Sequence, residues 1–178
     1  MFIIMKYKVF LFVVFVGAIF SGCHRQVRSA AEPVTITKKE APVMPDFVLN
    51  DTEGNPFSAL EYVKKNKLTI VDFWASWCGP CREEMPNVVA LYENYKNKGL
   101  GILGVSLDNS REAWIAAIKS MGITWPQVSD LKGWHNAAAV QFGIQSIPYT
   151  MILDNEGHLL ETNLRGDVLA SFVSVRLH

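Results

Sequence analysis

The segment that most constrains the fold is residues 68–81, which read LTIVDFWASWCGPC. The first seven residues are almost wholly apolar and rich in β-formers, which indicates a strand buried on both faces of a sheet. Cys78 and Cys81 follow, and Arg82 opens a helical pattern that continues to about residue 98. A buried strand that leads directly into a long helix is typical of an α/β domain.

The rest of the chain from residue 46 onward alternates in the same way. Residues 51–55 have turn chemistry and predict a hairpin between short strands on either side. Further strands are expected at residues 100–107, 149–153 and 158–163, and further helices at residues 58–61, 110–121, 136–142 and 167–176. This order predicts a central mixed sheet flanked by helices, with an N-terminal β-hairpin extension.

The first 22 residues predict an export signal. Lys6 and Lys8 precede a run of about 12 apolar or small residues, which is short for a membrane-spanning helix. The run ends at Phe20-Ser21-Gly22-Cys23, which resembles the lipobox of bacterial lipoproteins. The resemblance implies cleavage before Cys23 and acylation of that cysteine, and two or more acyl chains would anchor the protein stably. Simple secretion and an uncleaved N-terminal anchor are the alternatives.

The remaining organisation follows from composition. Residues 23–45 are polar and punctuated by proline, so we expect an acylated cysteine followed by a flexible tether. Residues 46–178 have ordinary globular composition and form the expected domain. The chain has 17 basic and 17 acidic side chains, and this balance argues against a nucleic-acid binder.

The cysteine pair suggests redox chemistry. A Cys78 thiolate at the start of a helix is stabilised by unpaired N–H groups and the helix dipole, so its pKa should fall below the ordinary value of about 8.5. Cys81 lies one turn further on, within disulfide reach, and would resolve a mixed disulfide formed by Cys78. A purely structural Cys78–Cys81 disulfide is disfavoured, because a bridge that closes two intervening residues constrains little of the unfolded chain. A metal site is disfavoured because the four histidines are scattered, and no cofactor is expected.

The chain resembles the TlpA/ResA-like thiol–disulfide oxidoreductases of the thioredoxin superfamily. The motifs that carry this resemblance are APVMPDFVLNDTEG (41–54), VDFWASWCGPC (71–81), GVSLD (104–108), SIPYTMILDNEG (146–157) and LRG (164–166). The resemblance implies a thioredoxin-like fold. Residues 109–134 are longer than a bare thioredoxin connection, and we interpret their three tryptophans mainly as core and loop packing.

Individual positions also match the family. Asp72 corresponds to the buried acid of thioredoxin and could relay a proton to or from Cys81. Glu84 matches a carboxylate thought to tune the cysteine pair, although an acid in a first helical turn is also ordinary. The resemblance places Ile147-Pro148 as a cis-proline loop facing the cysteines. The expected substrate contacts are Trp77, Gly79, Pro80, Ile147 and Pro148.

These features together predict an exported, membrane-tethered enzyme that reduces protein disulfides, with cytochrome c maturation as one setting. In family terms its electrons would come from a membrane donor of the DsbD/CcdA type. The first alternative is a peroxiredoxin-like thiol peroxidase, disfavoured because Ala75 replaces the threonine of a peroxidatic motif. The second alternative is a non-catalytic binding module, disfavoured by the intact cysteine pair.

Overall fold

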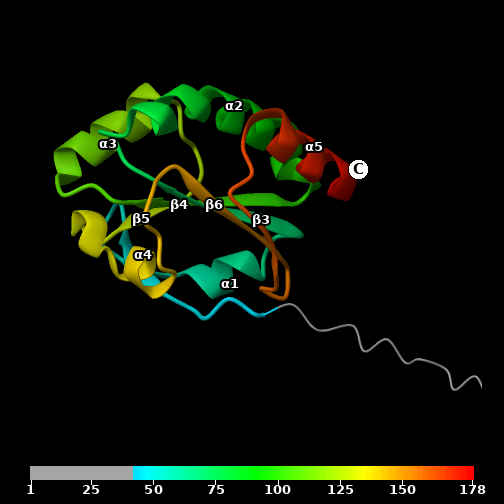
Figure 1. The fold of residues 1–178 in the computed structure, drawn as a ribbon, viewed down its shortest axis with the longest axis horizontal. Helices are drawn as coiled ribbons and strands as arrows, with labels where there is room; N and C mark the ends of the chain where they lie inside the picture. Colours follow the sequence, from blue (N-terminus) through cyan, green and yellow to red (C-terminus); the bar gives the residue numbers. More distant parts are fainter. Residues whose placement is uncertain (1–41) are drawn as a thin grey trace, which may run out of the picture. The chain divides into compact units, whose positions relative to one another are not determined.

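Strand β3 (Leu68–Trp74) forms the inner part of a seven-stranded sheet (Figure 1). The computed structural model describes residues 42–178. β3 pairs in parallel with β4 (Leu100–Ser106) on one side and antiparallel with β6 (Tyr149–Asp154) on the other. Every residue of β3 and of β4 is buried, as expected for apolar strands covered on both faces.

The sheet is mixed, with the order β2-β1-β5-β4-β3-β6-β7. The remaining strands are β1 (Val48–Asp51), β2 (Pro56–Ser58), β5 (Gln127–Ser129) and β7 (Leu159–Thr162). β1 and β2 form the expected N-terminal hairpin. The predicted fold class, a thioredoxin-like α/β fold with this extension, is confirmed.

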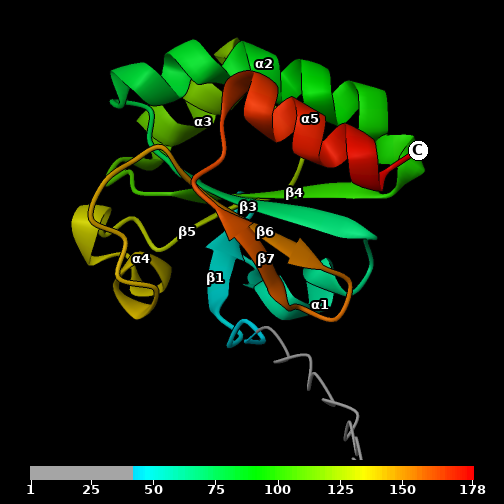
Figure 2. The ribbon, with the colours of Figure 1, turned by 45° about the vertical axis from the view of Figure 1, so that its right-hand side comes forward.

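Helices cover both faces of the sheet. Figures 1 and 2 place α2, α3 and α5 on one face and α1 and α4 on the other. Their bounds are α1 (Ala59–Val63), α2 (Gly79–Tyr95), α3 (Arg111–Ser120), α4 (Ala137–Gln141) and α5 (Gly166–Arg176), with short 3-10 turns η1 (Lys96–Lys98) and η2 (Gly133–His135).

Local sequence signals account for most helix ends. Ser58, Ser110 and Asn136 are N-caps whose side chains accept backbone N–H groups of the following turn. Gly99 has a φ of 108° and ends the α2–η1 segment in the left-handed region, which glycine adopts without steric strain. Helix α2 begins at Gly79, three residues before the expected start, so Cys78 is its N-cap and Cys81 lies in its first turn.

Two features differ from the sequence expectation. Residues 127–129 form β5, which joins the hairpin to the central sheet through Asn50 on one side and Val105 on the other. The packed part of the chain also starts before residue 46. Met44 is buried and its N–H donates to the Gly157 carbonyl at 2.8 Å. These contacts attach the end of the expected tether to the domain.

In the part of the chain from residue 42 to residue 178, the structure has no helix that is both long enough and apolar enough to cross a membrane. The expected signal sequence and Cys23 lie outside the described residues.

Candidate active site

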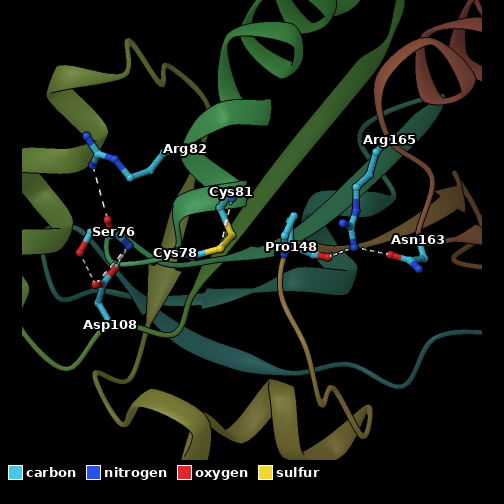
Figure 3. Close-up of a disulfide and its surroundings, with 8 residues drawn as sticks. All are labelled: Ser76, Cys78, Cys81, Arg82, Asp108, Pro148, Asn163 and Arg165. Atoms are coloured by element: carbon cyan, nitrogen blue, oxygen red, sulfur yellow. Dashed lines mark hydrogen bonds between the residues drawn. A yellow bond between two sulfur atoms is a disulfide. The ribbon is translucent and has the colours of Figure 1, made fainter.

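The centre of the site is a disulfide between Cys78 and Cys81 at the start of α2 (Figure 3). The Cα atoms of the two residues are 5.3 Å apart. Cys78 is the N-cap of α2, and its Sγ accepts a hydrogen bond from the Cys81 N–H at 3.2 Å. Gly79 and Pro80 form the intervening turn, where proline fits because the first helical positions need no N–H donor. Both cysteines are buried, Cys81 slightly more than Cys78.

Strand register brings a second segment to the cysteines. Phe73, near the end of β3, pairs with Tyr149 at the start of β6. Pro148 therefore lies at the edge of the sheet where the chain leaves β3 for the cysteine turn, and Figure 3 shows it beside the disulfide. The Ile147–Pro148 peptide bond is cis. Pro148 offers no N–H donor there.

Asp72 is buried beneath this turn, in the middle of β3. It pairs with Gly104 of β4 on one side and Thr150 of β6 on the other. Burial raises the pKa of Asp72 from its usual range to about 7, the nearby Arg165 guanidinium lowers it, and the Glu84 carboxylate raises it. Asp72 and Cys81 line the same small cavity of about 10 Å³. An acid with this pKa can exchange protons near neutral pH.

Arg165 and Glu84 border the same cavity and tie three segments together. The Arg165 guanidinium donates hydrogen bonds to the Pro148 carbonyl and to Asn163 Oδ1, the latter at 2.7 Å (Figure 3). Glu84 Oε1 accepts the N–H of Gly166 at 2.7 Å, which joins α2 to the start of α5. In the sequence, Arg165 stands out only as part of the LRG motif, which predicts no role for it.

A second polar network holds the other side of the cysteine turn. Asp108 is buried and accepts hydrogen bonds from the N–H and Oγ of Ser76, at 3.0 and 2.5 Å, and from Ser106 Oγ at 2.7 Å. Arg82 Nη1 donates to the Ser76 carbonyl at 3.4 Å (Figure 3). The network fixes the residues immediately before Cys78 to the end of β4. In the sequence, Asp108 is marked only as the last residue of the GVSLD motif, and no role was predicted for it.

Aromatic side chains lie at the rim. Trp77 precedes Cys78 and is 51% exposed, and its ring centroid is 6.1 Å from that of Trp134 in η2. Trp74, which the sequence suggested was packing, is fully buried, and its Nε1 donates to Gln127 Oε1 at 2.9 Å.

The structure also gathers Asp154, Glu156 and His158, whose potential ligand atoms lie within 4.8 Å of one another. The Asp154 carboxylate accepts the backbone N–H groups of Glu156 and His158, both at 2.9 Å, so it shapes the β6–β7 turn. This turn is at the end of β6 remote from Pro148.

A cysteine pair at a helix start, near a buried acid and beside a cis-proline, is chemically suited to cycle between disulfide and dithiol by exchange with other thiols and disulfides. Together the thioredoxin-like fold and the cysteine pair define the class, a thiol–disulfide oxidoreductase. The chain belongs to the AhpC/TSA family, which it matches over residues 41–162. The resemblance to TlpA/ResA-like proteins is confirmed by the relatives described next.

The thiol-disulfide oxidoreductase ResA of Bacillus cereus is 26% identical over 155 residues, which cover 87% of this chain and 84% of that protein. The thioredoxin domain of a Bacteroides vulgatus thiol-disulfide oxidoreductase is 32% identical, with a TM-score of 0.70 over 78% of this chain and 98% of that one. A Bacteroides fragilis thiol-disulfide oxidoreductase is 33% identical, with a TM-score of 0.70 over 75% and 98% of the two chains.

Proposed function

We propose that this enzyme reduces disulfides in exported proteins through Cys78 as nucleophile and Cys81 as resolving residue. The observation that carries the proposal is the position of the Cys78 sulfur, which caps α2 and accepts the Cys81 N–H. The same amide, together with the helix dipole, would stabilise a thiolate once the bond is reduced. The more buried Cys81 is then the sulfur that a substrate reaches less easily.

The reaction is two successive disulfide exchanges. The Cys78 thiolate attacks one sulfur of the substrate disulfide, forms a mixed disulfide and releases the other substrate sulfur as a thiolate, which takes up a proton from water. Cys81 then loses its proton and attacks Cys78 Sγ, which releases the second substrate thiol. Two electrons pass to the substrate and the Cys78–Cys81 disulfide is formed.

Asp72 would handle the proton of Cys81. It lines the same cavity as Cys81, and its pKa of about 7 lets it accept that proton near neutral pH and return it when the disulfide is reduced again. Glu84 would act as a tuning acid, because its carboxylate raises the pKa of Asp72. Neither residue forms a bond to the substrate in this scheme.

The substrate would bind across the rim of the site. Trp77 precedes Cys78, and Gly79 and Pro80 follow it at the start of α2. Pro148 lies beside the disulfide (Figure 3), and Ile147 precedes it through the cis peptide bond. We propose that these five residues contact the substrate. The backbone beside Pro148 can pair with an extended substrate segment, as in strand addition. Such pairing would orient the substrate disulfide toward Cys78.

The reducing direction requires a supply of electrons outside the cytoplasm, for which we propose a membrane dithiol donor of the DsbD/CcdA type. We propose further that residues 1–22 are a lipoprotein signal, that acylated Cys23 anchors the chain, and that the following residues tether the domain to a bacterial membrane, facing the periplasm or cell exterior. Substrates would be protein disulfides, including apocytochrome c in cytochrome c maturation.

Trapping tests the assignment of the two cysteines. With Cys81→Ala, the mixed disulfide formed by Cys78 cannot be resolved, so we expect substrate proteins to accumulate in covalent complexes that dithiothreitol releases. Cys78→Ser is the matched control and should trap nothing. Complexes that form equally through Cys81 when Cys78 is replaced would contradict the assignment.

The redox potential of the Cys78–Cys81 pair tests whether the enzyme reduces or oxidises its substrates. A reductase requires a potential near that of thioredoxin, about −270 mV, whereas a value near −120 mV would mark a disulfide-forming oxidase.

Two activity measurements test the alternative functions. Peroxide consumption that is lost in Cys78→Ser would favour a peroxidase. Insulin reduction that survives Cys78→Ala would favour a binding module.

A further inference from the structure

Two indole rings are exposed near the start of α2, and one of them belongs to Trp77, the residue that precedes Cys78. Trp77 is 51% exposed and Trp134 is 45% exposed. Within residues 42–178 they are the two exposed aromatic side chains, and the other large apolar side chains on the surface are valines. The two rings lie together, with centroids 6.1 Å apart and planes inclined at 55°. Two adjacent exposed indoles present apolar area that a partner could cover.

The loop that carries Trp134 is held by hydrogen bonds on both sides. Asp130 accepts the side-chain N–H of Asn136 at 2.9 Å and the backbone N–H of Ala137 at 3.0 Å. Leu131 has a φ of 57°, which is uncommon for leucine, and its N–H donates to Ser129 Oγ at 3.0 Å. The exposure of Trp134 is therefore a property of an anchored loop.

The same loop is attached to the cysteine turn. Ser129 Oγ donates to the Ser106 carbonyl at 2.8 Å, and Ser106 Oγ donates in turn to Asp108. Asp108 binds Ser76, the residue before Trp77. Trp134 is thus fixed relative to the turn through the end of β4. The contact between the two indoles is therefore made by segments that are held together by these hydrogen bonds.

Covalent geometry brings the substrate onto this surface. In a mixed disulfide the two Cα atoms are at most about 7 Å apart, and each residue flanking the substrate cysteine is about 3.8 Å further along its chain. Those flanking residues therefore lie within about 11 Å of the Cys78 Cα. The Cα of Trp77, the adjacent residue, is about 3.8 Å from the same atom. A substrate joined to Cys78 is thus brought close to Trp77 and, through the contact between the two rings, to Trp134.

We propose that Trp77 and Trp134 form a docking surface for an aromatic or aliphatic side chain next to the attacked cysteine in an extended, disulfide-bonded segment of the substrate. The inference rests on the proposed function and adds a preference in the substrate. Indole faces gain from apolar contact and from edge or offset packing with another ring, whereas a carboxylate there would lose hydration without a partner. Trp134 acts as a specificity residue in this arrangement.

A peptide series tests the preference. The reduced full chain is given peptides that contain one disulfide and differ only at the residue after the attacked cysteine, which is Phe, Leu, Ala or Asp. We expect kcat/KM to be about tenfold higher for Phe and Leu than for Ala and lowest for Asp, with the difference mainly in KM. Equal rates across the series, or a preference for Asp, would overturn the inference.

Two variants assign the preference to Trp134. Trp134→Ala should reduce the Phe-to-Ala ratio of kcat/KM to near one, and Trp134→Phe should retain most of it. Val175→Ala, which removes an exposed apolar side chain of α5, is the control and should keep the wild-type ratio. Retention of the full ratio by Trp134→Ala overturns the inference while the proposed function stands. If the wild-type chain reduces none of the peptides, the proposed function fails, and the docking surface fails with it.

Discussion

Asp72 shows how one buried residue can serve exchange chemistry at neutral pH. An unpaired carboxylate in a covered strand would be strongly disfavoured by the loss of hydration. Here the Arg165 guanidinium partly compensates for burial, so the pKa of Asp72 is raised only to about 7. The residue therefore populates both protonation states under physiological conditions. The family match predicts a buried acid at Asp72, but Arg165, whose charge compensates for burial, lies about 90 residues away in sequence.

The raised pKa of Asp72 predicts a pH-dependent stability. The folded protein binds this proton more tightly than the unfolded chain, so the associated stability is present at pH below about 4 and is lost as pH rises through about 7. Asp72→Asn removes that loss. In the oxidised protein we expect the variant to gain stability over the wild type between pH 4 and pH 8, by up to roughly 4 kcal/mol.

Urea unfolding of both oxidised proteins at pH 4 and pH 8 measures this gain. The readout is the change in the difference between the two proteins, because any constant effect of the asparagine cancels. A difference that stays the same at both pH values would show that Asp72 has an ordinary pKa in the folded state.

At the scale of elements, the turn before α5 controls the environment of the site. Arg165 donates to the Pro148 carbonyl, and Gly166 donates to Glu84, so this turn joins β6 and α2. The Arg165 guanidinium also lowers the pKa of Asp72. The role of Arg165 cannot be predicted from the sequence, because its contacts form only where the segment before β6 meets the turn before α5.

Arg165→Met predicts a further rise of the pKa of Asp72, because the variant removes the positive charge and leaves burial and Glu84 in place. Arg165→Lys keeps the charge and should shift this pKa less. Carboxyl chemical shifts of Asp72, followed by NMR across a pH titration, measure the effect. An unchanged midpoint in Arg165→Met would contradict the electrostatic role.

The contact between β4 and β5 depends on Gly104. A Cβ added at this glycine would lie 2.2 Å from the Gln127 side-chain amide, which is buried and bound to Trp74. Gly104→Ala should therefore destabilise the domain by about 1–3 kcal/mol. The reason is that the Gln127 amide must move, which weakens or breaks its hydrogen bond with Trp74. Gly79→Ala, where an added Cβ meets nothing within 4 Å, is the control.

Denaturant midpoints compare these two glycine variants. We expect a clear loss for Gly104→Ala and a small change for Gly79→Ala. Equal midpoints would mean that Gln127 can leave its place at little cost.

At the scale of the whole molecule, the features predicted correctly are those that depend on residues close together in the sequence. The caps at Ser58 and Ser110, the apolar strands β3 and β4, and the cysteine turn all carry strong local signals, and they lead to the correct fold class. Strand β5 was missed because its three residues are too few to show a strand period. Its pairing with β1 is a long-range contact, and so is the meeting of Trp134 with Trp77.

The proposed anchor predicts a property of the full chain that lies outside the described residues. Cys23→Ser removes the sulfur to which the lipobox would attach the lipid. We expect the wild-type protein to carry the mass of its acyl chains and to enter the detergent phase in Triton X-114 partitioning, and the variant to do neither. A wild-type protein of unmodified mass that stays in the aqueous phase would contradict the anchor.

The most direct test of the account is the ionisation of Cys78. The chain has three cysteines, so Cys23→Ser combined with Cys81→Ala leaves Cys78 as its one thiol. Ultraviolet absorbance of the thiolate, followed across a pH titration of the folded protein, gives its pKa. We expect the pKa of Cys78 to lie clearly below the value of about 8.5 for free cysteine, and the rate of alkylation by iodoacetamide to follow the same titration curve. A pKa at or above that value would contradict the account.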